Sequence, residues 1–214
     1  MARWFTADTH FSHANIIKYC KRPFEDTVAM NNQIVSNINE LVSGDDELWI
    51  LGDIAMGLLD ESLPIVKKIN AKKILVAGNH DRCHPYYGNK SESYIQKYVD
   101  ETGAIELHTG NTNLTLMDGT EVAVSHFPYA EPSPRVLASV SGEDNANSTD
   151  KFAKYRPVDN GGWLLCGHVH EKWAVQGRQV NVGIDAWGGY PVAEATIVEI
   201  VKSKIHDKSR IIWK

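Results

Sequence analysis

The chain has 214 residues, of which 43% are hydrophobic and 23% charged, a composition typical of a globular protein with a substantial core. Its formal net charge of −5 argues against a protein that coats nucleic acid, although it leaves room for a local basic groove. The N-terminus reaches Asp8 too soon for a signal peptide, and no apolar run has the length of a membrane span. We therefore expect a soluble, cytoplasmic protein with a single domain over residues 1–214.

The first half of the chain alternates between the patterns of strands and helices. Short apolar runs predict three β-strands, at residues 3–7, 48–50 and 74–77. Apolar residues at helical spacing predict helices at residues 27–42 and 60–70, and a further helix is expected at 91–101. This alternation is typical of a doubly wound α/β layer.

The second half has the pattern of a β-rich, antiparallel structure. Asp118-Gly119 lies between the apolar runs 114–117 and 121–125, which is a strong hairpin signal. Further strands are expected at residues 163–166, 173–176, 179–182 and 195–201. The polar segment 131–160 is expected to be a long loop, which is either a lid or simply mobile.

Polar side chains follow five of the predicted strands. They are Asp8 and His10, then Asp53, then Asn79 and His80, then His126 after the hairpin, and finally His168 and His170. Because α/β sheets bind ligands outside the carboxyl ends of their strands, we expect these side chains to meet at one edge.

The residue types narrow the ligand to a pair of metal ions. Carboxylate, imidazole and amide donors without thiolate suit Mn²⁺ first, with Fe, Zn²⁺, Ni²⁺, Co²⁺ or Mg²⁺ as alternatives, and argue against Ca²⁺ or a structural zinc. Apart from His80, the set is too large for one tetrahedral ion and sufficient for two ions that share a carboxylate. Such a pair clamps the oxygens of a phosphoryl group and generates hydroxide near neutral pH.

At this point the sequence resembles a known family. Asp8-Thr-His10, Gly52-Asp53, Gly78-Asn-His-Asp81, His126 and Gly167-His-Val-His170 are similar in order and wording to the calcineurin-like metallophosphoesterase superfamily. Residues 6–24 further resemble compact bacterial and phage-encoded members. The resemblance implies a four-layer αββα sandwich, with two packed mixed sheets flanked by helices.

The resemblance also implies a role for each motif residue. The first metal is expected on Asp8, His10 and His170, the second on Asn79, His126 and His168, with Asp53 bridging. His80 matches the histidine that binds the phosphate and protonates the leaving oxygen, and Asp81 matches the residue that orients it.

Three neighbouring features are open to two interpretations. His13 either faces the phosphate or steadies its own loop. Arg82 either neutralises a substrate oxygen or is an ordinary surface arginine. Lys18, Lys21 and Arg22 form a basic cluster, which we expect to be a solvated surface run rather than a substrate contact.

The first functional hypothesis is hydrolysis of a phosphodiester by metal-hydroxide attack, with His80 as general acid. The substrates considered are small phosphate esters of nucleotide type, including cyclic nucleotides and short nucleic-acid ends, without stable nucleic-acid binding. The alternative is a phosphomonoesterase, such as a nucleotidase or a protein phosphatase. A non-catalytic scaffold of the same fold is the third hypothesis, and the complete ligand set argues against it. The oligomeric state stays open.

Overall fold

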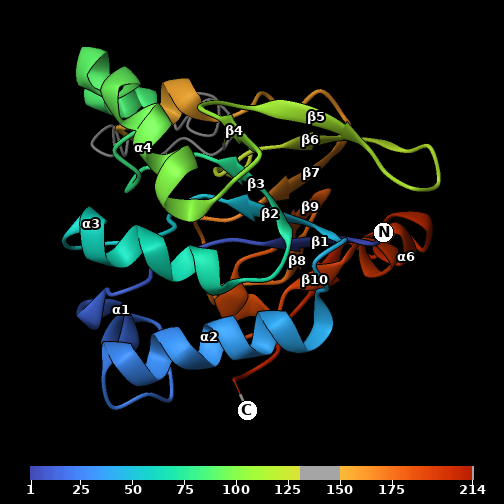
Figure 1. Ribbon diagram of the computed structural model, residues 1–214. Helices are drawn as coiled ribbons and strands as arrows, with labels where there is room; N and C mark the ends of the chain where they lie inside the picture. The colour runs from blue at the N-terminus through green and yellow to red at the C-terminus, as the bar shows by residue number, and fades with distance from the viewer. Residues whose placement is uncertain (131–149, 214) are drawn as a thin grey trace, which may run out of the picture.

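The computed structural model describes residues 1–130 and 150–213, which build two β-sheets packed face to face (Figure 1). The first sheet has the order β10 (Val192–Ala193), β1 (Arg3–Thr6), β2 (Glu47–Leu51), β3 (Lys72–Val76) and β4 (Glu106–His108). The second sheet has the order β11 (Asp207–Lys208), β8 (Val175–Gln176), β9 (Gln179–Asn181), β7 (Trp163–Cys166), β6 (Glu121–Val124) and β5 (Thr112–Thr115).

Both sheets are mixed. In the first sheet β1, β2 and β3 run parallel, as the alternating first half predicts. β4, which was not expected, continues the parallel order, and β10 pairs antiparallel at the edge. In the second sheet the hairpins β5–β6 and β8–β9 are antiparallel, but β6, β7 and β9 are parallel to one another. The expectation of an antiparallel second half is therefore wrong at its centre, because long connections insert β7 between strands that local turns cannot reach.

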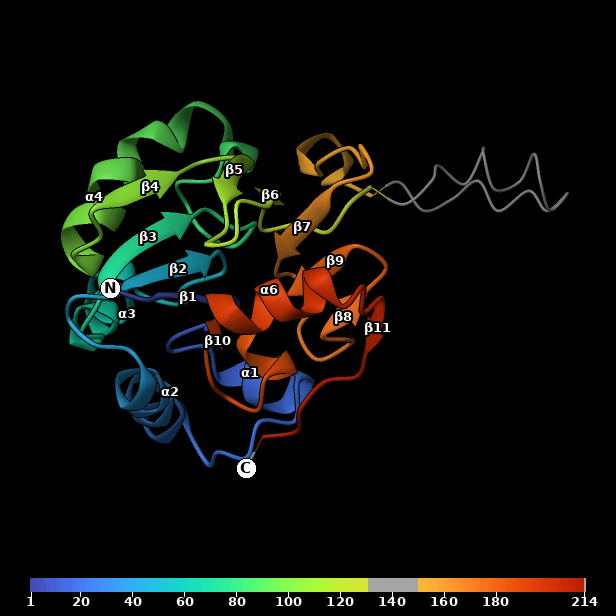
Figure 2. The same cartoon turned by 90° about the vertical axis from the view of Figure 1, so that its right-hand side faces the viewer.

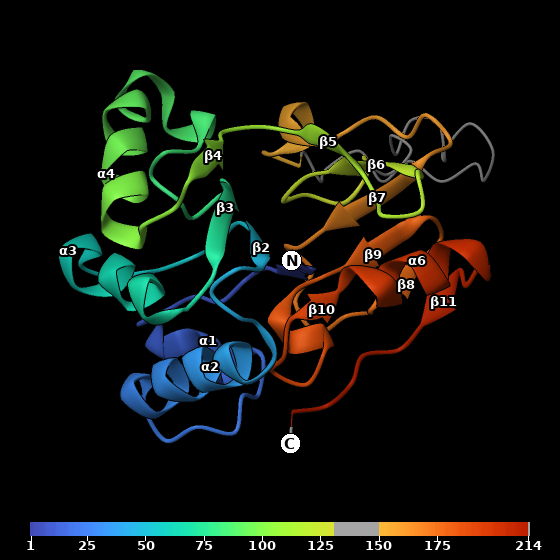
Figure 3. The ribbon, with the colours of Figure 1, turned by 45° about the vertical axis from the view of Figure 1, so that its right-hand side comes forward.

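Helices cover the outer face of the first sheet (Figure 3). They are α1 (Ala14–Tyr19), α2 (Thr27–Leu41), α3 (Leu59–Ser62) with the 3-10 helix η1 (Leu63–Lys68), the 3-10 helix η2 (Pro85–Lys90) and α4 (Glu92–Thr102). The Asp26 carboxylate begins α2 by accepting from Ala29 N at 2.8 Å. The single helix expected at 60–70 is divided, because Pro64 has no N–H to continue the hydrogen bonding of α3 and lies instead in the first turn of η1.

Apolar residues on both faces of β2 join the two main cores. Leu48 and Ile50 face the helices and pack in the cluster that contains Ile34 and Leu63. Trp49 and Leu51 face the second sheet and pack in the cluster between the sheets. Side chains alternate along a strand, so a strand buried on both faces is a continuous apolar run, as the sequence shows here.

The segment expected as a strand at 195–201 is instead the helix α6 (Glu194–Lys202). Its β-branched composition favours a strand. However, Ile197, Ile200 and Val201 are spaced by three and four residues, and as a helix they pack together against the core between the sheets. α6 lies beside β10 and β1 (Figure 2). This packing outweighs the local preference.

Two packed mixed sheets with flanking helices confirm the expected architecture. The long loop expected at 131–160, as a lid or simply a mobile segment, falls largely on residues 131–149, which lie outside the described residues. Residues 150–160 include a short 3-10 helix, η3 (Ala153–Tyr155). No helix in the two described ranges combines the length and the apolar character needed to cross a membrane.

Candidate metal centre

The loops that follow the strands are bound to one another through their backbones. Asp8 N donates to Gly52 O and His10 N to Asp53 O, both at 3.0 Å, which joins the loops after β1 and β2. Gly167 N donates to His126 O at 3.0 Å and joins the loops after β7 and β6. Across the two sheets, His168 N donates to the Asp8 carboxylate and His126 Nδ1 lies 2.8 Å from Leu51 O. The carboxyl ends of both sheets therefore meet at one edge, as expected for an α/β ligand site.

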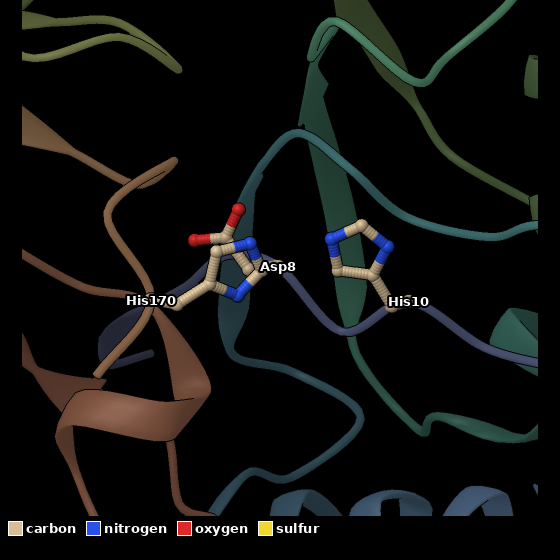
Figure 4. Close-up of side chains that lie close together, drawn as sticks. All are labelled: Asp8, His10 and His170. Carbon is tan, nitrogen blue, oxygen red and sulfur yellow. The ribbon is translucent and has the colours of Figure 1, made fainter. Parts of the chain in front are cut away.

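A first cluster of candidate ligands consists of Asp8, His10 and His170. One potential ligand atom from each residue lies within 4.8 Å of the others. Figure 4 shows Asp8 and His170 side by side, with His10 opposite them. The buried Asp8 carboxylate accepts the backbone N–H of His168 at 2.9 and 3.1 Å, which orients it toward the loop after β7.

A second cluster consists of Asp53, His126 and His168, whose ligand atoms also lie within 4.8 Å of one another. Asn79 extends it, because its Oδ1 lies 3.0 Å from His126 Nε2. The structure thus brings together all seven residues that the sequence analysis assigned to metals.

Asp53 lies between the two clusters. Its Oδ2 is 3.6 Å from His10 Nε2, in the first cluster, while its Oδ1 is 3.5 Å from His126 Nε2, in the second. One carboxylate therefore presents one oxygen to each side, which is the arrangement that a bridging ligand requires.

The donor atoms fit cations better than hydrogen bonds. The Leu51 carbonyl accepts from His126 Nδ1 at 2.8 Å, so Nε2 is left with its lone pair toward Asn79 Oδ1 and Asp53 Oδ1, which are also lone-pair atoms. His10 Nε2 is buried and has no hydrogen-bond partner among the described residues. Converging lone pairs without a hydrogen between them are favourable around a positive ion.

Burial and neighbouring charges shift the pKa values in the centre. Burial lowers the pKa of His10 far below its ordinary value and that of His168 to about 3, so both imidazoles stay neutral, the form that binds metal. Burial also raises the pKa of Asp8 to about 6. Although burial opposes charge on His170, Asp8 and Asp185 raise its pKa to about 11. The same carboxylates would attract a metal ion in place of that proton.

Burial would likewise raise the pKa of Asp53, but His126, His10 and His80 hold it below its ordinary value. The carboxylate is therefore ionised at neutral pH, as a bridging ligand must be.

The backbone at the candidate ligands is strained. Eight non-glycine residues in the described ranges have a positive φ, and five of them are Asp8, His10, Asp53, His168 and His170. This left-handed conformation costs roughly 1–2 kcal/mol per residue. Strain of this kind persists where the surrounding structure enforces it, and it is common at functional sites.

Gly78 allows the loops after β2 and β3 to approach closely. A Cβ atom at this position would lie 2.3 Å from Asp53 Oδ1 and 2.4 Å from Asp53 N, distances that real Cβ atoms do not show. The glycine of the Gly-Asn-His-Asp motif is thus required by the position of Asp53.

His80 lies beside the centre and is accessible. Its side chain is 43% exposed, and its Nε2 lies 4.0 Å from Asp53 Oδ2. His80 N donates to Asp53 Oδ1 at 2.8 Å, which holds the residue next to that carboxylate.

Asp81 does not make the contact that we expected. Its Oδ2 accepts from the backbone N–H groups of Gly78 and Asp53 at 2.7 and 2.9 Å, and its Oδ1 accepts from Ile54 N at 3.1 Å. No hydrogen bond joins Asp81 to His80 in the described structure. Asp81 instead fixes the backbones of two loops, because a buried carboxylate is satisfied most readily by nearby N–H groups.

The remaining predicted residues differ in their placement. His13 Nδ1 lies 3.2 Å from His10 Nδ1, so His13 contacts a candidate ligand. The exposed Arg82 lies over the ring of Tyr87, 5.5 Å from its centroid. Lys18 and Lys21 are exposed, but the expectation of a solvated Arg22 is wrong, because Arg22 is buried against Asp185.

Asp185 is the residue that the sequence analysis missed. It is fully buried, and its Oδ2 lies 3.2 Å from His170 Nδ1. Arg22 holds its pKa below the ordinary value although burial opposes this. No motif marks Asp185, and the only available signal was its position shortly after the strand expected at 179–182.

The chain is similar to known proteins over most of its length. The calcineurin-like phosphoesterase family model matches residues 1–172. The chain is 28% identical to the gene 66 protein of Mycobacterium phage L5 over 97% of both chains. It is 36% identical to the uncharacterized protein MJ1445 of Methanocaldococcus jannaschii over 72% of this chain and 85% of that protein.

A solved structure shares the fold. The protein of unknown function AQ665 from Aquifex aeolicus superimposes with a TM-score of 0.61 at 23% identity, covering 93% of this chain and 98% of that chain. Because the family model matches most of this chain, the chain belongs to the calcineurin-like phosphoesterases, a metal-dependent family of hydrolases.

Proposed function

We propose that this protein hydrolyses phosphodiesters of nucleotide type at a centre that holds two divalent ions, with Mn²⁺ as the first choice. The observation that carries the proposal is the placement of two ligand clusters on opposite oxygens of Asp53, with the accessible His80 beside them. Asp8, His10 and His170 would hold one ion, and Asn79, His126 and His168 the other. When bound, two such ions supply Lewis acidity toward the phosphoryl oxygens and activate water.

His80 is proposed as the general acid. It is the most accessible imidazole beside Asp53. The Asp53 carboxylate fixes its backbone, while its ring is exposed to substrate. A proton on the His80 ring can be donated to the oxygen of the leaving alcohol. Asp81 has a structural role, because its carboxylate holds the backbones of Gly78 and Asp53 in place.

The charges around the centre support a diester over a monoester. A phosphate monoester carries a charge of roughly −1.5 to −2 at neutral pH, whereas a diester carries a single charge. Arg22, which lies behind the first cluster, has its charge paired with Asp185, and the exposed Arg82 lies over Tyr87. With Arg22 paired and Arg82 stacked on Tyr87, we favour the singly charged substrate.

The substrate class is tested with an aryl phosphodiester and the matching aryl monoester, each assayed with Mn²⁺, Ni²⁺, Zn²⁺ and Mg²⁺. We expect a higher kcat/KM for the diester. A clear preference for the monoester under every metal would contradict the diester proposal and favour the phosphomonoesterase alternative.

The catalytic role of His80 is tested by His80→Ala. Loss of a general acid lowers kcat by about 10²- to 10⁴-fold, and metal content should stay at two ions because His80 is not a proposed ligand. His206→Ala is the control, since His206 is an exposed histidine directly before β11. Unchanged activity in His80→Ala would remove His80 from the mechanism, and fewer than two ions in the wild-type protein would remove the paired site.

A further inference from the structure

Asp185 is a buried carboxylate with four donors around it. Its Oδ1 accepts from Arg22 Nε at 2.8 Å and from Trp213 Nε1 at 3.0 Å. Its Oδ2 accepts from Arg22 Nη2 at 2.8 Å and lies 3.2 Å from His170 Nδ1. Each oxygen therefore has two partners, and the carboxylate is fully satisfied.

Arg22 extends this network to the loop after β1. Besides the two-pronged contact with Asp185, its Nη2 donates to Asp8 O at 2.7 Å and its Nη1 to Thr9 O at 2.9 Å. The side chains of Arg22 and Asp185 are completely buried. A buried ion pair is a poor source of stability by itself, so its retention requires a structural or functional reason.

The contact with His170 supplies that reason. An ionised carboxylate can only accept, so Asp185 fixes the hydrogen of His170 on Nδ1 and leaves the lone pair of Nε2 for an ion beside Asp8. Arg22 at the same time holds the backbone that carries Asp8. Two residues of the first cluster are thus positioned by one ion pair.

We propose that Asp185 and Arg22 are positioning residues for the first metal, which orient His170 and Asp8 from behind. This inference rests on the proposed function, because it needs His170 and Asp8 to be ligands. Carboxylates behind metal-binding histidines commonly fix the ring and strengthen binding, and their loss costs about 10- to 100-fold in metal affinity.

Two members of the network lie beyond the part of the chain that the family model covers. That model ends at residue 172, whereas Asp185 and Trp213 come later. Trp213 packs edge-to-face on Phe24, with ring centroids 5.3 Å apart, and the Arg22 guanidinium lies 5.6 Å from the Trp213 ring centroid. The C-terminal segment therefore covers the ion pair and completes the centre.

Asp185→Asn is the sharpest perturbation. The amide keeps the shape of the carboxylate but replaces one oxygen with an NH₂ group. Because both oxygens face two donors, either orientation of the amide places a donor against donors. Arg22→Lys is the second variant, which keeps the charge but cannot make all four contacts. It keeps the proposal testable even where Asp185→Asn fails to fold.

The measurement is a calorimetric titration of metal-free protein with Mn²⁺, with the melting temperature recorded in parallel. We expect two ions in the wild-type protein and, in both variants, a loss of about 10- to 100-fold in affinity for one ion only. Glu194→Gln is the matched control. It removes another charged contact, with Arg3 and with Met117 N, and should leave both affinities unchanged.

A merely structural role predicts a different result. General destabilisation would weaken both ions together, and that outcome would overturn the proposal, as would wild-type affinity for both ions in the two variants. In the Zn²⁺-loaded wild-type protein, ¹⁵N NMR should show the His170 hydrogen on Nδ1, and a hydrogen on Nε2 would also overturn it. Fewer than two ions in the wild-type protein would instead overturn the proposed function, and the inference with it.

Discussion

Gly78→Ala gives the most direct test of how the loops set the metal centre. The added Cβ would lie 2.3 Å from Asp53 Oδ1, whereas ordinary van der Waals contact begins at 3.4 Å, so the carboxylate would have to withdraw by about 1.1 Å. It would also lie 2.4 Å from Asp53 N, which is held by Asp81 and cannot yield easily. Overpacking of this kind costs roughly 1–3 kcal/mol.

For a chain of this size, each kcal/mol lowers Tm by about 2–4 °C, so we expect a loss of about 2–12 °C. A displacement of about 1 Å can cost on the order of 100-fold in activity. Thermal unfolding is measured with a chelator and again with Mn²⁺, because an ion that binds only the folded state raises Tm. We expect this increase to be smaller in Gly78→Ala than in the wild-type protein.

Gly110→Ala is the matched control. Neither glycine has a positive φ, but a Cβ at Gly110 would meet no atom within 4 Å. The control should therefore keep the wild-type Tm and the wild-type response to Mn²⁺. The reasoning is refuted when Gly78→Ala behaves like Gly110→Ala in both measurements.

Two further predictions concern parts of the structure that contain no proposed ligand. The buried Tyr98 hydroxyl accepts from Arg82 N at 3.0 Å, so Tyr98→Phe should lower the free energy of unfolding by about 1–3 kcal/mol in denaturant titrations; an unchanged value would show that another acceptor replaces the hydroxyl. Asp46 accepts from Ala2 N, Ser43 N and Ser43 Oγ, which lower its pKa to about 2. Its stabilisation is present above the ordinary value near 3.8 and is lost as the pH falls toward 2, so Tm should fall more steeply over that range in the wild-type protein than in Asp46→Asn. Parallel curves for the two proteins would contradict this.

The candidate ligands could be predicted from the sequence because each follows a strand and stands in a short motif. Strand ends are local features, and polar residues directly after apolar runs identify them. Asp185 and Arg22 could not be predicted in the same way, because their relation depends on how residues far apart in the chain fold together. Arg22 in particular has the sequence context of a surface residue.

The fold was predictable to a similar extent. The parallel order of β1, β2 and β3 follows from the alternation of strand and helix. The parallel placement of β7 between β6 and β9 does not, since local turns give no information about long connections. The β-branched residues of α6 favour a strand, so a strand is expected there. The segment forms a helix because of its contact with the core between the sheets, which the local sequence does not show.

The left-handed backbone at Asp8, His10, Asp53, His168 and His170 affects how mutational data on this centre must be interpreted. Alanine at such a position removes the donor atom but keeps the Cβ that the native residue already has, so the steric strain of the Cβ stays. Glycine removes the same donor and also releases the strain, because it accepts that conformation readily. The difference between His10→Gly and His10→Ala therefore measures the conformational contribution, and the alanine variant alone reports on coordination. For this protein, a glycine substitution at a candidate ligand would combine the release of backbone strain with the loss of a metal contact.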